Sequence, residues 1–168
     1  KIWNEPQKIK IIAGSSGSIM RDSLCQFLRH RLLGLKEVMP EQNVNEKNPV
    51  DIKVFWNYSK HIAFIEIKWL GKSISNTTYS QSRALEGAKQ LADYMDDYNG
   101  QNPNNVPIGY LVVFDARRRK IDSPIANLTN EDVNFYLDKD IEYNPKYEEV
   151  REDFETPKRF FLHAKLDN

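Results

Sequence analysis

Two runs of β-branched and aromatic residues stand close together in the first half of the chain, Val50–Trp56 and His61–Leu70. A short polar turn separates them, so the pattern predicts a β-hairpin. Because side chains alternate across a strand, Glu66 and Lys68 leave the second strand on one face and their apolar neighbours leave on the other. Asp51 lies inside the first run. The hairpin therefore carries two carboxylates and an ammonium where burial without partners is costly.

Two longer stretches, residues 19–35 and 79–98, repeat their apolar positions at intervals of three and four, which is typical of amphipathic helices. Ile108–Asp115 is a nearly unbroken apolar run, as expected for a strand covered on both faces and lying beside the second strand of the hairpin. Residues 158–166 alternate well enough for a last strand. One more strand is expected, either at Val38–Val44 or at Lys8–Ala13.

A glycine-rich turn, Gly14–Ser18, follows the run Lys8–Ala13. A strand, such a turn and a helix start can cradle a phosphate on backbone N–H groups. Neither a P-loop nor a dinucleotide fingerprint is complete here, because the lysine with Ser/Thr and the third glycine are missing. A flexible loop with Ser18 as the N-cap is the favoured interpretation.

The charged residues of the hairpin suggest a particular chemistry. Two carboxylates from neighbouring strands, Asp51 and Glu66, form an oxygen-rich site suited to Mg²⁺, which binds one or two carboxylates and keeps several waters. A lysine beside them, such as Lys68, can orient the attacking water or stabilise the charge that develops as a phosphodiester breaks. The alternative is an ordinary salt bridge across one strand face.

The segment Pro49–Asp51, followed after fourteen residues by Glu66, Ile67 and Lys68, resembles the motif of the PD-(D/E)xK nuclease superfamily. The proline stands one place further from the aspartate than in that motif. The resemblance implies that Asp51 and Glu66 bind the metal with a backbone carbonyl near Ile67, and that Lys68 is the catalytic lysine. It also implies an α/β fold with a restriction-endonuclease-like core, a central mixed β-sheet of αβββαβ type flanked by helices.

RecB-like members of this superfamily carry a Q-x-x-x-Y feature on the helix after the catalytic strand, and Gln90 with Tyr94 matches it. The resemblance implies that these two side chains help to position DNA near the site. The alternative is a helix boundary at which Tyr94 packs in the core and Gln90 is solvated.

Many members of the superfamily place a further acid near the metal. Glu41, shortly before the motif, and Asp22, on the first predicted helix, are equal candidates for this role. Asp22 is also in a place to complement the positive N-terminus of its helix.

The densest positive cluster comes directly after the strand Ile108–Asp115 and consists of Arg117, Arg118, Arg119 and Lys120. At a strand end these side chains can contact a phosphate backbone and add a salt-dependent contribution to binding. Lys72, in the turn after the hairpin, is a further candidate. A solvated run of charges is the alternative for both.

Size and composition bound these interpretations. With 168 residues and 40% hydrophobic content the chain suits one domain, with a core at about residues 19–120 and a peripheral acidic segment at 121–168. The net charge of zero argues against strong non-specific binding of nucleic acid by the domain as a whole. The single cysteine, Cys25, excludes an internal disulfide and fits a reducing compartment. Without a membrane-length apolar run or a leader, an intracellular, cytoplasmic protein is expected.

The sequence thus predicts a Mg²⁺-dependent deoxyribonuclease, with Mn²⁺ able to substitute and with DNA as the partner. RNA stays open as a substrate, as do a homodimer and a further domain, since a start at Lys1 suggests an excised part of a longer protein. Two alternatives are a catalytically silent nucleic-acid- or protein-binding module on the same fold, and a nucleotide-binding α/β domain that uses the Gly14–Ser18 turn.

Overall fold

The computed structural model describes residues 16–45, 48–57, 61–73 and 75–163, without the side chains of residues 16, 17, 19, 35, 36, 41–45, 48 and 125. The longer elements carry the core and the shorter ones lie mainly in the second half of the chain. In chain order they are α1 (Ser16–Arg31), β1 (Leu35–Asn45), β2 (Asn48–Trp56), β3 (Ile62–Lys72), β4 (Thr78–Tyr79), α2 (Gln81–Gln101), β5 (Ile108–Asp115), η1 (Ile125–Asn127), α3 (Asn130–Val133), α4 (Tyr147–Val150) and β6 (Lys158–Phe161).

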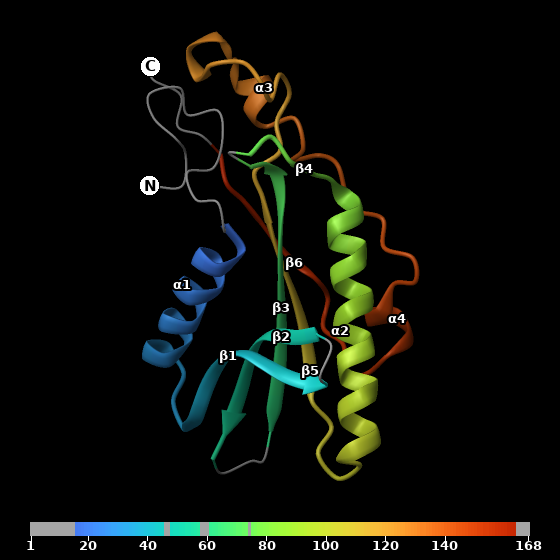
Figure 1. The fold of residues 1–168 in the computed structure, drawn as a ribbon. Helices are drawn as coiled ribbons and strands as arrows, with labels where there is room; N and C mark the ends of the chain where they lie inside the picture. Colours follow the sequence, from blue (N-terminus) through green and yellow to red (C-terminus); the bar gives the residue numbers. More distant parts are fainter. Residues whose placement is uncertain (1–15, 46–47, 58–60, 74, 164–168) are drawn as a thin grey trace.

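The strands form one six-stranded mixed sheet in the order β1-β2-β3-β5-β6, with the short β4 paired to β3 (Figure 1). Strands β1, β2 and β3 are antiparallel to one another, whereas β3, β5 and β6 run parallel. This confirms the predicted α/β fold with a mixed sheet flanked by helices. β1 confirms the strand expected at Val38–Val44, while Lys8–Ala13 lies outside the described residues.

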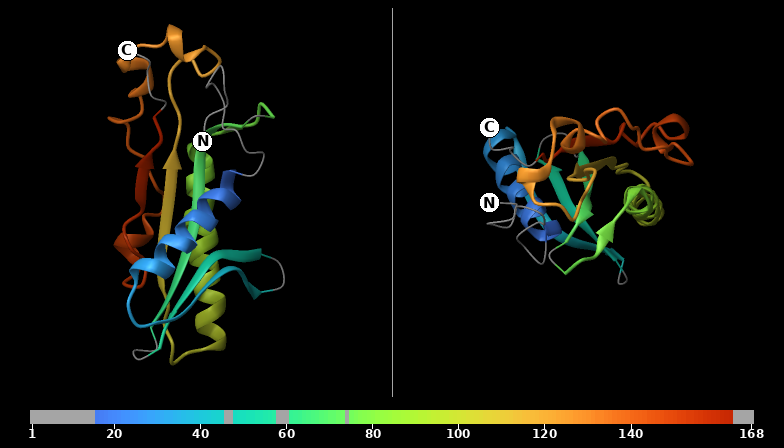
Figure 2. Two further views of the ribbon diagram at one scale, coloured as in Figure 1. Left: turned by 90° about the vertical axis from the view of Figure 1, so that its left-hand side faces the viewer. Right: turned by 90° about the horizontal axis from the view of Figure 1, so that it is seen from above.

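The two long helices cover opposite faces of the sheet, as the view from above makes plain (Figure 2). On β3, Ile65 and Ile67 pack with α1, whereas Phe64 packs with α2. Ten consecutive residues of β3, Ile62–Gly71, are buried as a result. A central strand beside the parallel β5 is covered on both faces, so Glu66 and Lys68 cannot reach bulk water as they would on an open face.

The first helix is shorter than its periodicity predicts. α1 ends at Arg31, because Gly34 turns the chain with φ +72° directly before β1 begins. Ser18 lies inside α1 rather than at its N-cap, since the helix begins at Ser16. Phe27, predicted for the buried stripe, is 56% exposed. α2 is displaced by two residues at its start and continues to Gln101.

The segment after β5 is more than a peripheral cover. Phe154 is 4% exposed and joins the core on the α2 side of the sheet, where Tyr143 and Tyr147 pack against it. The predicted last strand is shorter than expected, because β6 ends at Phe161. Among the described residues, no helix is long and apolar enough to cross a membrane.

Candidate active site between the sheet and helix α2

Asp51 stands where β2 separates from β3. The pairing of these strands runs from Phe55 opposite Ile62 to Ile52 opposite Ile65, and the β1–β2 hairpin then crosses towards α2 (Figure 1). Beyond this point the backbone N–H of Ile67 donates to Asp51 Oδ2 at 2.8 Å. The carboxylate therefore supplies the acceptor that the neighbouring strand no longer provides, and it lies against the peptide that joins Glu66 to Ile67.

Glu66 and Lys68 form an ion pair on the face of β3 that α2 covers. The Lys68 Nζ lies 2.5 Å from Glu66 Oε1, and the two residues are only 7% and 3% exposed. The pKa of the Glu66 carboxyl is raised to about 7, by burial first and then by the charge of Asp51, while Lys68 opposes both. The pair thus places an acid that titrates near neutrality inside an apolar layer.

Helix α2 is shaped to receive Lys68. A Cβ at Gly87 would lie 2.6 Å from Lys68 Cγ and 2.8 Å from Lys68 Cε, so only glycine leaves room for the lysine stem. This role of Gly87 was not predicted from the sequence. A glycine in mid-helix was the available signal, because it costs stability and needs a packing or functional reason.

Tyr94 and Gln90 lie on the same helix, further along this interface. Tyr94 is 4% exposed, and its pKa is raised by burial first and then by the negative charges of Glu66 and Asp51. Its phenol therefore stays neutral beside the two carboxylates. The side-chain oxygen of Gln90 is buried, which differs from the solvated glutamine of the alternative interpretation.

Among the side chains that the structure describes, two buried oxygens of this region have no hydrogen-bond partner, Glu66 Oε2 and Gln90 Oε1. Buried polar atoms are nearly always paired, so each such exception needs an explanation. Both atoms are acceptors, and a hard divalent cation is a partner that binds carboxylate and amide oxygens. The residues present therefore fit a metal ion of the Mg²⁺ class.

The described side chains include no group of three or more His, Cys, Asp or Glu residues able to hold a metal ion. Asp22 does not join Asp51 and Glu66, because α1 covers the opposite face of the sheet and the Asp22 side chain is 61% exposed there, paired with Arg21 at 3.2 Å. Glu41 lies on β1, and its side chain is outside the described part. The acids that the structure brings together are thus Asp51 and Glu66.

The basic residues after β5 are largely engaged within the protein. Arg117 binds the carboxylate of Asp115 through Nε and Nη2, at 3.0 and 2.7 Å. Arg118 is 6% exposed and donates to the carbonyl of Ser123 at 3.0 Å. Lys120 pairs with Asp132 at 3.0 Å. These contacts reduce the charge available to a phosphate backbone.

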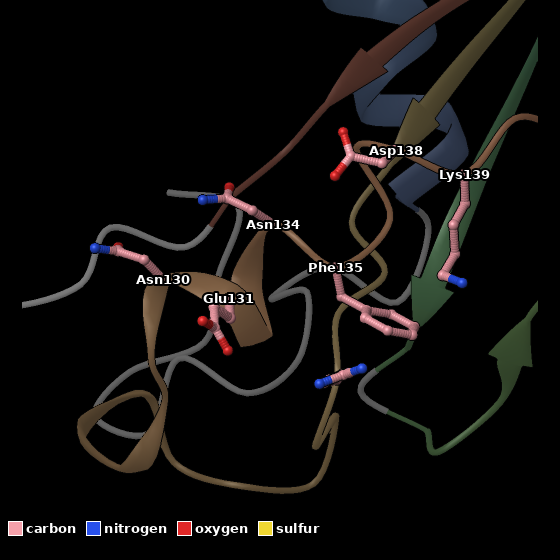
Figure 3. Close-up of a pocket in the computed structure, with 7 residues that line it drawn as sticks. Asn130, Glu131, Asn134, Phe135, Asp138 and Lys139 are labelled. Carbon is pink, nitrogen blue, oxygen red and sulfur yellow. The ribbon is translucent and has the colours of Figure 1, made fainter.

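Arg119 is the exposed arginine of the cluster, and its guanidinium stacks 4.1 Å from the ring centroid of Phe135. Figure 3 shows this ring beside the ammonium of Lys139, in a pocket around α3 that Arg119 also lines. α3 lies beyond the C-terminal ends of β3 and β5, away from the middle of β3 (Figure 1). Lys72, at the end of β3, pairs with Asp122.

No family model matches the chain, and comparisons with curated proteins and with solved structures find no match. The geometry of the residues is therefore what any functional assignment depends on.

Proposed function

We propose that this chain is a metal-dependent nuclease domain that hydrolyses phosphodiester bonds of DNA on a restriction-endonuclease-like core. The observation that carries the proposal is the convergence of Asp51, Glu66 and Lys68, with one buried Glu66 oxygen that has no hydrogen-bond partner among the described side chains. The chain order also supports it, because α1, β1, β2, β3, α2 and β5 follow one another as an αβββαβ core requires, with β4 as a small addition.

Each residue has a role that its position supports. Asp51 and Glu66, with a main-chain carbonyl near Ile67, hold Mg²⁺ or Mn²⁺. When bound, such an ion polarises the phosphoryl oxygen and lowers the pKa of water. Lys68 keeps a positive charge beside Glu66 and orients the attacking water or stabilises the developing negative charge.

Gln90 and Tyr94 seat the DNA from α2. Tyr94 supports this role because its neutral phenol faces the two acids, where it can donate a hydrogen bond without adding negative charge. Gln90 stands one turn before Tyr94 and supplies an amide whose oxygen has no hydrogen-bond partner in the described part of the chain.

The test is cleavage of single-stranded, double-stranded and branched DNA, and of RNA, with Mg²⁺ or Mn²⁺. The near-isosteric variants Asp51→Asn, Glu66→Gln and Lys68→Met each remove one charge, and Asp93→Asn on the outer face of α2 is the matched control. We expect each site variant to lose at least about 100-fold in activity, as single catalytic groups contribute roughly this much. Full activity in Glu66→Gln and Lys68→Met would overturn the assignment.

A catalytically silent DNA-binding module is the second candidate, and the closed Glu66–Lys68 ion pair is the observation that favours it. In such a protein the ion pair between Lys68 and Glu66 stays closed, and no divalent cation binds to the Glu66 carboxylate. A Mg²⁺ titration followed by calorimetry separates the two candidates, with Glu66→Gln as the control. Binding that disappears in the variant supports the nuclease, and heat signals that are absent in both support the binding module.

A further inference from the structure

Lys53 lies on β2 two residues after Asp51 and therefore on the same face of that strand. Its register partner on β3 is Phe64, which itself stands two residues before Glu66. The Lys53 ammonium is 4.8 Å from the ring centroid of Tyr98 and 5.7 Å from that of Phe64. Two aromatic rings in edge-to-face contact thus hold this ammonium at one position between β2 and α2.

Among the side chains that the structure describes, no carboxylate pairs with the Lys53 ammonium, and burial lowers its pKa. Lys72, Lys89 and Lys120 differ, because each forms an ion pair with an aspartate. A partly buried cation with no counter-charge among the described side chains is a place where an external anion can bind.

The interface between β3 and α2 shows on which side of Glu66 this lysine lies. Lys68 contacts Gly87 near the start of α2, and Phe64 contacts Tyr98 near its end, so the helix runs antiparallel to the strand. Lys53 and Lys68 therefore stand on opposite sides of Glu66. Lys68 is four residues after Phe64 on β3, so the backbones of these two positions are about 13 Å apart at ~3.3 Å per residue.

We infer that Lys53 binds a backbone phosphate of the DNA substrate, on the side of the two carboxylates opposite Lys68. The inference rests on the proposed function and narrows it, because it assigns one phosphate contact of the DNA to β2, on the Phe64 side of Glu66. Since a phosphate contact carries no base specificity, Lys53 contributes to affinity for every sequence alike.

The experiment measures binding of fluorescently labelled single- and double-stranded DNA of twelve nucleotides, with Ca²⁺ in place of Mg²⁺, as salt rises from ~50 to ~200 mM. Lys53→Met keeps the apolar stem over Tyr98 and removes the charge. We expect it to reduce the slope of log affinity against log salt by about 1 and to weaken binding roughly tenfold at the lower salt. Lys53→Arg keeps the charge and is expected to keep the wild-type slope.

Lys89→Met is the matched control, because Lys89 lies on α2 with its side chain 69% exposed and paired with Asp93. It removes one positive charge from the exposed face of α2, which is not part of the proposed DNA contact. Its salt slope should therefore equal that of the wild-type protein. Thermal unfolding of all three variants shows whether any loss of affinity follows from a loss of structure.

The outcomes separate this inference from the proposed function. If the wild-type protein binds DNA and Lys53→Met keeps its salt slope, the inference is overturned while the nuclease assignment stands. If Lys53→Met reduces the salt slope by about 1 but the wild-type protein cleaves no DNA with Mg²⁺ or Mn²⁺, the phosphate contact stands and the nuclease assignment falls. A wild-type protein that binds no DNA overturns both.

Discussion

Two buried carboxylates of the same sheet, Asp115 and Glu66, have opposite surroundings. Asp115 is 1% exposed and accepts hydrogen bonds from the side chains of both Arg117 and Arg159. Glu66 is 3% exposed, Lys68 donates to its Oε1, and its Oε2 has no hydrogen-bond partner among the described residues. A saturated ionic cluster such as that of Asp115 stabilises the fold, whereas a buried carboxylate oxygen without a partner needs a further explanation. On the proposed function, that explanation is a bound metal ion.

The largest expected effect concerns the saturated cluster. Asp115→Ala leaves two guanidiniums, those of Arg117 and Arg159, without their counter-charge in a buried position. We expect the free energy of unfolding to fall by about 3–5 kcal/mol, as measured by urea denaturation. Asp93→Ala, which removes an exposed partner of Lys89, is the control and should change stability by less than about 1 kcal/mol. A loss of similar size in both variants would contradict the architectural role of Asp115.

A pH titration of stability tests the same comparison at Glu66. Because burial raises its pKa from 4.5 to about 7, the folded state binds a proton more tightly than the unfolded state. The contribution of Glu66 to the free energy of unfolding is therefore fully present below pH 4.5. It is lost as pH rises through about 7, by about 3 kcal/mol in total. Urea denaturation across this range should show the decline in the wild-type protein and much less of it in Glu66→Gln. Glu86→Gln, an exposed glutamate on α2, should leave the decline unchanged.

Gly87→Ala tests how closely α2 fits the acidic site. The new methyl group would stand 2.6 Å from Lys68 Cγ, so the lysine must move away from Glu66. We expect a loss of roughly 1–3 kcal/mol in unfolding free energy and a lower kcat, because overpacking costs about this much.

Gly100→Ala on the same helix is the matched control. A Cβ at Gly100 meets nothing within 4 Å, so this variant should be stabilised by about 0.5–1 kcal/mol. In the double variant Gly87→Ala/Lys68→Ala the two effects should not add, since the second change removes the clash. Additive losses of stability would show that Gly87 acts independently of Lys68.

The smallest effect is expected at the C-terminal end of β3. Lys72 pairs with Asp122, whose side chain is 71% exposed, so solvent screens most of the attraction. Asp122→Asn should change the free energy of unfolding by less than about 1 kcal/mol. Raising the salt concentration should reduce even this difference, and a larger change would make the pair part of the core rather than of the surface.

The positions that are set by short-range pattern could be predicted, while those set by distant partners could not. The hairpin, the parallel strand β5 and the common face of Glu66 and Lys68 follow from alternation and apolar runs, which are local properties. The apolar period continues to Leu35, four residues past the end of α1 at Arg31, and the sequence signal for that end is Gly34, which takes the left-handed turn before β1.

Which charged side chains pair with one another depended on tertiary contacts. Arg117, predicted to contact DNA, is neutralised by Asp115 in a cluster that Arg159 completes from 44 residues away. Sequence alone contained the acids and the bases, but not their pairing, because ion pairs form between side chains that the fold brings together.

The sequence by itself determined that Asp51, Glu66 and Lys68 would lie on two neighbouring strands, since the two-residue period of a strand dictates which side chains share a face. Only the tertiary structure decided that helix α2 would cover them, that Gly87 would make room for Lys68, and that the ring of Tyr98 would hold Lys53. The reason is that packing across the sheet joins residues far apart in the chain, and the burial it creates gives these charges their energies.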